Sequence, residues 1–345
     1  MHKIIKIIVA MHLYMGIQMH ATVQRKIDLY FESKDPQAQI KMEPVEWPVR
    51  FVYADTLYGK LLRKGVDLFG YAATCHQARI KNLAHPSTVK KHIDHYMTFY
   101  KDLINMEHFE TPENGFRTFN DWFIRRLKSP DTDRPLEDNA SAISSPADCK
   151  LLILPNITLD AMVTIKEKRF NIAQFLDNAE LAQKYEHGVM MIFRLAPYDY
   201  HRYHVPFDCK IGPEQFIAGK YHSVNPRAFM CGVQPLTVNK RTYEILYPQD
   251  FGQTEPVVMV QVGATAVASI VNNFMDYSSA QPVLRYYADA VFSKGDEMGY
   301  FQFGGSTLVL LFAPNTIIPD PQVIQNSLNG FETAVKARET IGYWR

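Results

Sequence analysis

The spacing of hydrophobic residues divides the chain into a helical part and a β-rich part. Between about residues 45 and 128, apolar residues recur every three or four positions, which is the period of one helix face. Between about residues 145 and 315, short apolar runs such as "KLLIL", "VMMIFRL" and "TLVLLF" are separated by Gly, Pro and Asn, which is typical of strands. We therefore expect an α+β fold, with N-terminal helices packed on a mostly antiparallel β core.

Two segments of the helical part carry clear helix signatures. In "STVKKHIDHYMTFYKDLINM" the apolar residues fall on one face, and Ser87 is placed to cap the helix. These residues are Val89, Ile93, Tyr96, Tyr100 and Leu103. In "TFNDWFIRRLK", Thr118 is followed three residues later by Asp121, which predicts a capping box at the start of a short helix.

A third helical segment, "TLYGKLLRKGVDLF" (56–69), is both amphipathic and basic. Its apolar face holds Leu57, Leu61, Leu62, Val66 and Phe69. Lys60, Arg63 and Lys64 lie elsewhere on the helix. Such a helix can bind an anionic membrane surface, or it can cover a core with its charges in solvent. The pattern by itself favours the second interpretation.

The first 22 residues form an apolar leader ahead of a domain that spans residues 23–345. The apolar stretch from Ile7 to Ile17 is shorter than the 20 or so residues that a membrane-spanning helix needs. Early lysines and a poor cleavage pattern fit a signal peptide and an interfacial anchor about equally well. The sequence leaves both possibilities open.

Composition restricts the possible partners and cofactors. The 345 residues are 47% hydrophobic and 21% charged, which is the composition of a globular protein, and the net charge of +1 gives no argument for nucleic acid. The four cysteines are scattered without a CxxC pair, so we expect reduced, structural cysteines. Cys209, His222 and Cys231 lack the spacing of a metal site, and we expect no metal.

Three distant stretches supply the residue types of a base-activated hydroxyl. "SPADCKL" holds Asp148, "PYDYHRYHVPFD" holds His201 and His204, and "GGST" holds Ser306 at the start of an apolar strand. A serine hydroxyl becomes a nucleophile when an imidazole accepts its proton and a third group orients that imidazole. Each stretch alone is weak evidence, because an isolated Asp is usually a loop cap and an isolated GGST is usually a turn.

The two histidines are spaced in a way that favours separate tasks. Pro197 and Pro206 bracket the pair and indicate an extended chain, in which His201 and His204 would point to opposite faces. A joint metal site would be easier to form on a helix.

Together these stretches resemble one known family. "KGDEMGYFQFGGST" resembles the cleavage segment of the phosphatidylserine decarboxylases, which are pyruvoyl enzymes that cut themselves between a glycine and a serine. "YDYHRYHVP" is similar to the family's histidine segment, "SPADC" to its aspartate segment and "TFNDWFIRRL" to its N-terminal helix signature. "YHSVNP" and "VGATAVASI" resemble internal strands, so the resemblance covers about residues 23 to 314.

The resemblance implies that the chain cuts itself between Gly305 and Ser306. The products would be a β chain (1–305) and an α chain (306–345). His204, oriented by Asp148, would take the Ser306 proton, and Oγ would attack the Gly305 carbonyl. The resulting ester would eliminate, and the dehydroalanine that remains would hydrolyse to a pyruvoyl group. Glycine at 305 would let the hydroxyl approach and would accept a strained backbone.

The covalent pyruvoyl group made from Ser306 is the cofactor that the resemblance implies. It would bind the amine of phosphatidylserine as a Schiff base and accept electrons as CO2 leaves, giving phosphatidylethanolamine. His201 is the candidate general acid that protonates the product carbanion. The lipid substrate implies a peripheral membrane protein. With this substrate, membrane binding by residues 56–69 becomes as well supported as the interpretation in which this helix covers a core. The resemblance also implies a homodimer.

The sequence departs from the family pattern at several positions. The cleavage motif is Gly-Gly-Ser-Thr where Leu-Gly-Ser-Thr is commoner. Cys149 and Ala268 stand where glycines are usual, and Lys240 replaces an acidic residue. None of these changes alters Asp148, His204 or Ser306.

Other functions remain open at this stage. A related pyruvoyl enzyme could decarboxylate a free aromatic amino acid such as tryptophan. A chain that keeps the Ser, His and Asp residues could also be a hydrolase, or an inactive fold that serves as a binding surface.

Overall fold

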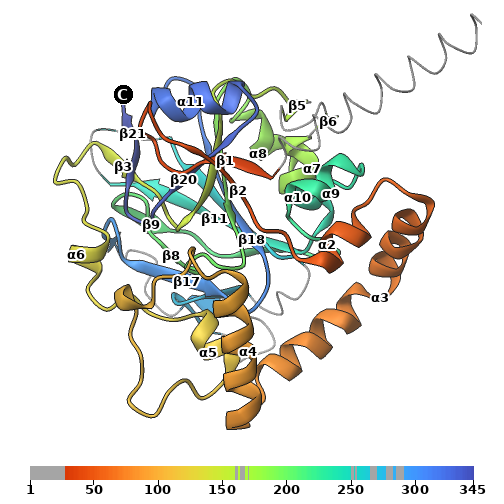
Figure 1. Ribbon diagram of the computed structural model, residues 1–345. Coiled ribbons are helices and arrows are strands. Elements are labelled where there is room, and N and C mark those ends of the chain that lie inside the picture. Colours follow the sequence, from red (N-terminus) through yellow and green to blue (C-terminus); the bar gives the residue numbers. More distant parts are fainter. Residues whose placement is uncertain are drawn as a thin grey trace, which may run out of the picture.

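A computed structural model describes residues 28–345, except 160–161, 164–167, 170, 250–251, 253–254, 265–269, 277–282 and 285–290. It confirms the α+β fold, with the long N-terminal helices on one side of the large sheet and short helices at other places around it (Figure 1). The predicted leader (1–22) and Ala268 lie outside the described residues.

The core is one long sheet whose described pairings are antiparallel, apart from a parallel pair between β1 (Leu29–Phe31) and β20 (Glu332–Val335). From one edge to the other, its strands are β16 (Val291–Phe292), β9 (Cys209–Ile211), β11 (Arg241–Pro248), β12 (Val257–Val262), β18 (Ser306–Phe312), β7 (Val189–Leu195), β4 (Cys149–Leu154), β20 (Glu332–Val335), β1 (Leu29–Phe31) and β2 (Ile40–Met42), with β10 (Gln215–Ile217) also on β11. The central strands β18, β7, β4 and β12 are buried at every position, as continuous apolar runs require.

Smaller sheets and short helices surround this core. The smaller sheets comprise β13 (Ile270–Asn272), β17 (Glu297–Phe301) and β8 (Arg202–His204); β19 (Ile317–Pro319), β21 (Thr340–Trp344) and β3 (Ala142–Ser144); and the pairs β14 (Met275–Asp276) with β15 (Val283–Leu284) and β5 (Met162–Val163) with β6 (Lys168–Arg169). The short helices here are α7 (Ile172–Leu176), α8 (Ala179–Gln183), α9 (Pro226–Met230), α10 (Pro235–Val238) and α11 (Pro321–Leu328).

The predicted helical part contains α2 (Trp47–Val52), α3 (Leu57–Lys81), α4 (Pro86–Phe99), the 3-10 helix η1 (Met106–His108) and α5 (Phe119–Phe123), and the short α6 (Pro130–Asp133) follows it. The capping box of α5 is confirmed, because both the Thr118 and the Asp121 hydrogen bonds are present. The cap of α4 was predicted wrongly: His85 precedes the helix, and Ser87 Oγ bonds to the His85 ring instead. Helix α4 also ends at Phe99, before the predicted Leu103.

Helix α3 does not cover a core with its apolar face, so that interpretation of residues 56–69 is wrong. Leu57, Leu61 and Phe69 are 76%, 57% and 67% exposed. The buried positions of the helix are Gly59, Arg63, Gly70 and Thr74. Three small residues and Arg63 thus form the inner face of α3, and most of its large apolar residues are exposed.

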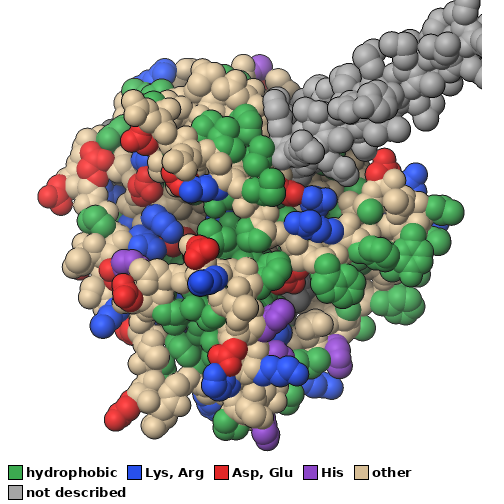
Figure 2. Space-filling model, in the orientation of Figure 1, with side chains coloured by type: hydrophobic (Ala, Val, Ile, Leu, Met, Phe, Trp, Pro, Cys, Tyr) green, Lys and Arg blue, Asp and Glu red, His purple; other side chains and the backbone are tan. Residues whose placement is uncertain are grey.

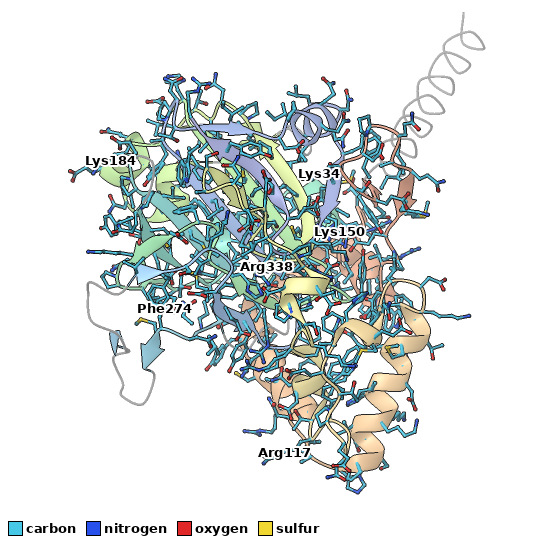
Figure 3. All side chains as sticks on the ribbon, turned by 90° about the vertical axis from the view of Figure 1, so that its left-hand side faces the viewer. Lys34, Arg117, Lys150, Lys184, Phe274 and Arg338 are labelled. Atoms are coloured by element: carbon cyan, nitrogen blue, oxygen red, sulfur yellow. The ribbon has the colours of Figure 1, made fainter. Side chains whose placement is uncertain are left out.

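A buried cation joins the N-terminal segment to the central sheet. Arg194 on β7 donates to Glu43, which follows β2, at 2.6 Å and to Glu332 on β20 at 2.9 Å. All three side chains are buried. Lys150 on β4 is likewise enclosed by the fold (Figure 3). Desolvating a buried ion costs several kcal/mol, and only attraction to an opposite charge offsets that cost. Each of these cations therefore depends on its carboxylates.

Replacing Arg194 with Met should therefore destabilise the protein strongly. The substitution leaves Glu43 and Glu332 buried without their shared cation, and we expect a loss of about 3–5 kcal/mol in the free energy of unfolding. Arg126→Met removes an exposed arginine that is 3.7 Å from Glu297 and should cost less than about 1 kcal/mol. Urea unfolding of the two variants measures the difference; equal stability of the two would refute the role given to Arg194.

Candidate active site

Two chain reversals bring the predicted nucleophile and one predicted histidine together. The chain leaves β7 at Leu195, turns, and enters β8 at Arg202, while β17 ends at Phe301 and β18 begins at Ser306. Strand β7 pairs with β18, and β8 pairs with β17. The turn 196–201 and the loop 302–305 therefore lie at the same end of the two strand pairs.

Ser306 contacts His201. Ser306 Oγ lies 3.4 Å from His201 Nδ1, and both side chains are fully buried. His201 Nε2 lies 3.1 Å from the carbonyl of Ala196, which can only accept a hydrogen bond, so Nε2 carries the proton. The lone pair of Nδ1 consequently faces the serine hydroxyl. The Phe123 ring stacks on the imidazole with 4.0 Å between ring centroids and fixes its plane.

The imidazole of His201 is neutral. Burial, together with the nearby Arg125 guanidinium, lowers the pKa of His201 to about 3. An imidazole with that pKa is an acceptor at physiological pH, in agreement with the tautomer that the Ala196 carbonyl selects.

His204 lies at the end of β8 and has other partners. Its Nδ1 donates to the Gly295 carbonyl at 2.9 Å, and its Nε2 accepts from the Tyr200 hydroxyl at 3.1 Å. The backbone N–H of His204 donates to the Pro146 carbonyl at 2.8 Å, which places it beside the segment that leads to Asp148. Burial lowers the pKa of His204, although the Gly295 carbonyl and the charges of Glu297 and Asp148 oppose that effect.

Asp148 is buried immediately before β4 and is held by a cation. Arg134 donates to both carboxylate oxygens, at 3.0 and 2.8 Å, and the Ala337 N–H donates at 2.8 Å. Burial alone would raise the pKa of Asp148, but Lys336, Arg134 and the Ala337 N–H together lower it below its ordinary value. Asp148 is thus a fixed negative charge.

The geometry therefore differs from the relay expected from sequence. Among the described residues, Ser306 is in contact with His201, and no hydrogen bond joins His204 to Ser306 or to Asp148. Asp148 acts on His204 through its charge alone. The roles assigned to Asp148, His201 and His204 stay predictions.

Helix α5 holds the loop that precedes Ser306. Asn120 Oδ1 accepts the Phe303 N–H at 2.9 Å, and the rings of Phe119 and Phe123 lie 5.3 and 5.2 Å from the Phe303 ring. The local sequence around these residues predicts no such positioning role. The signal was present in the "TFNDWF" signature, but its partner is about 180 residues away in the chain.

A buried ion pair anchors the turn that carries His201. Asp199 accepts from Lys150 Nζ at 2.8 and 3.0 Å and from the Ala196 N–H at 2.7 Å. Ala196 in turn supplies the carbonyl that orients His201. Lys150 and Asp199 were missed because nothing in the local sequence distinguishes them from surface charges.

The glycine that needs an unusual backbone is Gly304, so the expectation of strain at Gly305 was wrong. Gly304 has φ 138°, in a region that L-residues avoid. Gly305 is absent from the positive-φ glycines, and a Cβ there would meet only Val224, at 3.5 Å. A Cβ at position 305 would therefore make only an ordinary van der Waals contact.

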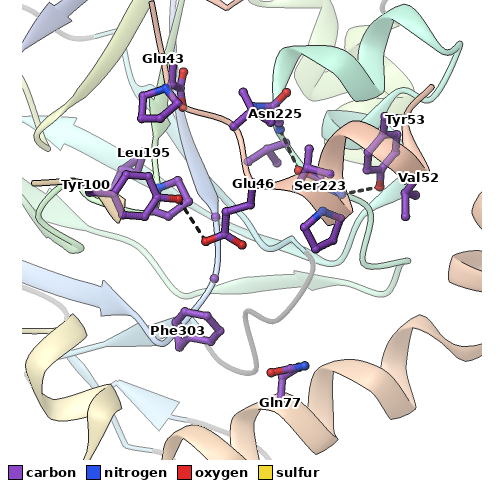
Figure 4. A pocket seen from close by; sticks show the side chains of 18 of the residues that line it. Glu43, Glu46, Val52, Tyr53, Gln77, Tyr100, Leu195, Ser223, Asn225 and Phe303 are labelled. Carbon is purple, nitrogen blue, oxygen red and sulfur yellow. Dashed lines mark hydrogen bonds between the residues drawn. The ribbon is translucent and has the colours of Figure 1, made fainter. Parts of the chain in front are cut away.

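A pocket of about 390 Å³ opens against Gly304 and Gly305. Residues 43–53, α3, α4 and the segment 223–225 form its other walls (Figure 4). Glu46 accepts from the Tyr100 hydroxyl at 3.2 Å inside it, and the Tyr53 hydroxyl accepts from the Ser223 N–H at 2.8 Å. The pocket thus places an open space beside the predicted scission site.

Two of the positions that depart from the family pattern lie away from the contact between Ser306 and His201. Cys149 is buried in β4, next to Asp148, and Lys240 Nζ lies 5.4 Å from the centroid of the Phe216 ring. Among the described residues, no group of three or more His, Cys, Asp or Glu is placed to hold a metal ion.

Comparison with known proteins decides the family. The family model described as phosphatidylserine decarboxylase matches residues 119–343. The chain belongs to the phosphatidylserine decarboxylase family. A phosphatidylserine decarboxylase proenzyme of Fusobacterium nucleatum is 33% identical over 315 residues, which cover 91% of this chain and 96% of the relative. Proenzymes of Chlamydia pneumoniae (33% identical, 87% and 93% covered) and Desulfitobacterium hafniense (32%, 91% and 97%) are similar.

The phosphatidylserine decarboxylase match begins at Phe119, the first residue of α5. It therefore contains every residue of the contact between Ser306, His201 and Phe123, as well as Asp148 and His204. The pocket walls contributed by residues 43–53, α3 and α4 lie before the matched range.

Proposed function

We propose that the chain is a proenzyme that cuts itself between Gly305 and Ser306 and then decarboxylates phosphatidylserine to phosphatidylethanolamine and CO2. The observation that carries this proposal is the fully buried Ser306 hydroxyl, which directly follows Gly305 and lies 3.4 Å from Nδ1 of the neutral His201 imidazole. The similar proteins are described as phosphatidylserine decarboxylase proenzymes, and that name implies processing of the chain.

The residues around Ser306 fit a pyruvoyl group. Ser306 is fully buried at the first position of β18, where its backbone pairs with Leu195, so a group made from it would be held rigidly. A pyruvoyl carbonyl binds a substrate amine and accepts the electrons that a departing carboxylate leaves behind. The pocket beside Gly305 gives an amine access to this position.

We propose that the two histidines divide the work. His201, whose Nδ1 faces the Ser306 side chain without a proton, would first accept a proton from the substrate ammonium group and would then donate it to the carbon that loses CO2. His204, with Asp148 as a nearby negative charge, would accept the Ser306 proton during self-cleavage. His204 Nε2 accepts from Tyr200 in the structure, so that transfer requires a change of hydrogen-bond partner. Donation to Gly295 keeps the proton on Nδ1 and leaves Nε2 as the basic nitrogen.

Ser306→Ala should abolish scission, because it removes the attacking hydroxyl. The unchanged chain is expected to give two fragments, 1–305 and 306–345, with the smaller one blocked at its N-terminus by a keto group. Ser306→Ala should give a single full-length chain. Intact mass and borohydride reduction measure both results. A mature, active protein of unbroken length would refute the proposal.

Variants of the two histidines test the division of roles. His201→Ala should still be cut but should lose at least about a hundredfold in decarboxylation, which is a usual contribution of a general acid. His204→Ala should remain largely uncut. Gel analysis for scission and CO2 release for turnover separate the two effects. If His201→Ala remains uncut while His204→Ala is processed, the 3.4 Å contact is the base contact and the roles are reversed.

The comparisons lend no support to a free aromatic amino acid as substrate. CO2 release from phosphatidylserine vesicles and from free tryptophan distinguishes the two substrates. A hydrolase or an inactive binding fold would keep its peptide bond at Gly305, so the mass measurement above also excludes those alternatives. The homodimer implied by the family resemblance stays a prediction.

A surface on α2 and α3 supports peripheral membrane binding, which we include in the proposal. Large apolar side chains gather over these helices (Figure 2). This α2–α3 apolar surface consists of Trp47, Phe51, Leu57, Tyr58, Leu61, Leu68, Phe69 and Tyr71, each more than half exposed. Lys60 and Lys64 are exposed on the same helix, whereas Arg63 points inward and donates to Val52 and Ala54. No helix in the described part of the chain is long and apolar enough to cross a bilayer.

Replacing Leu61 and Phe69 together with Ser should weaken vesicle binding at least about tenfold. Each buried apolar side chain contributes roughly 1.5–3 kcal/mol, and the double variant removes two from the contact. Sedimentation with phosphatidylserine-containing vesicles measures the affinity, and scission should proceed normally. Leu328→Ser on α11, where the residue is 59% exposed, is the matched control. Equal binding of the two variants would contradict the assigned surface.

A further inference from the structure

The pocket contains a lysine whose surroundings are unusual. Lys81, the last residue of α3, lines the pocket together with Gly304 and Gly305. Its Nζ lies 4.3 Å from the centroid of the Phe119 ring, 4.9 Å from that of Phe303 and 5.9 Å from that of Tyr96. The side chain is half-buried, so the aromatic faces replace part of its water shell.

Aromatic faces attract a cation but give its N–H groups nothing to bond. An ammonium group has three N–H donors, and in the described part of the chain Lys81 Nζ has no hydrogen bond or ion pair. The pocket's arginine, Arg194, is by contrast saturated by Glu43 and Glu332. Burial lowers the pKa of Lys81 to about 8 against the opposing charge of Glu46, so the ammonium is still the main form at neutral pH.

We propose that Lys81 is the anion-binding residue of the pocket and that it binds the phosphodiester of the substrate's headgroup. This inference rests on the proposed function. A partly desolvated cation with free donors binds an oxyanion more strongly than a lysine in water does. Glu46 supplies a carboxylate in the same pocket, and such a pair of charges suits a headgroup that carries both signs.

The reaction favours the phosphodiester over the carboxylate as the ligand of Lys81. The substrate carboxylate leaves as neutral CO2, so a cation bound to it would stabilise the ground state and slow the reaction. The phosphodiester keeps its charge throughout. Binding it contributes equally to the ground state and the transition state, so removal of Lys81 should raise KM and leave kcat nearly unchanged.

The experiment uses the self-cleaved, full-length protein with Lys81→Met, Lys81→Arg and, as a matched control, Lys90→Met. Lys90 is an exposed lysine on α4 that pairs with Asp94 and does not line the pocket. Two soluble inhibitors serve as probes: glycerophosphoethanolamine has a phosphodiester and no carboxylate, and O-methylserine has a carboxylate and no phosphodiester. Their inhibition constants are measured together with kcat and KM on phosphatidylserine–detergent micelles.

Lys81→Met should weaken inhibition by glycerophosphoethanolamine roughly ten- to a hundredfold, the loss expected for a charge-assisted hydrogen bond, and should raise KM similarly. Lys81→Arg should restore most of the affinity, and Lys90→Met should behave like the unchanged protein. Unchanged inhibition by glycerophosphoethanolamine in Lys81→Met would overturn the proposal. A selective loss of O-methylserine binding would also overturn it, because Lys81 would then bind the carboxylate.

A second measurement needs no variant and covers the case in which Lys81→Met does not fold. Acetylation of lysines in the unchanged mature protein is followed by peptide mass, with and without glycerophosphoethanolamine. Protection of Lys81 but not of Lys90 is expected, and equal labelling with and without the probe would refute the assignment. Failure of the proposed function would look different: the unchanged protein itself would remain uncut or would release no CO2.

Discussion

The pairing of β7 with β18 is the constraint on which the site depends. Its register sets Ser306 opposite Leu195, the last residue before the turn that carries His201. Side chains alternate between the two faces of a strand, so a slip of one residue would turn Ser306 away from the imidazole. The ion pairs of Arg194 on β7 with Glu43 and Glu332 oppose such a slip, because it would move the buried cation away from its carboxylates. The rigid central sheet thus holds Ser306 Oγ at 3.4 Å from His201 Nδ1.

Paired buried charges fix the segments around this contact. Lys150 and Asp199 anchor the His201 turn, Arg134 holds Asp148, and Arg194 ties the N-terminal segment to the sheet. Each pair is costly to desolvate and adds little net stability when compared with apolar packing. Such pairs provide position here. They orient the Ala196 carbonyl, the Asp148 carboxylate and the pocket wall at Glu43 more exactly than apolar contacts would.

The pocket and the α2–α3 apolar surface share their helices. Helix α3 carries exposed apolar residues on its outer side and ends at Lys81 in the pocket wall. A lipid whose chains remain in a membrane must deliver its polar headgroup to a protein site a short distance from the interface. In the proposed function, one helix that contacts both regions would offer that arrangement, with the apolar surface for the membrane and the pocket for the headgroup.

The sequence by itself determined the α+β class, the capped helix at Thr118, the β18 strand with Ser306 at its start, and the family, because these depend on local periodicity and on short motifs. It could not determine which histidine meets Ser306, since His201 and His204 are three residues apart and only the pairing of β8 with β17 decides where each ring points. It also missed Asn120, Lys150 and Lys81, and it misplaced the glycine strain by one residue. Those features depend on partners far apart in the chain, and only tertiary packing brings such partners together.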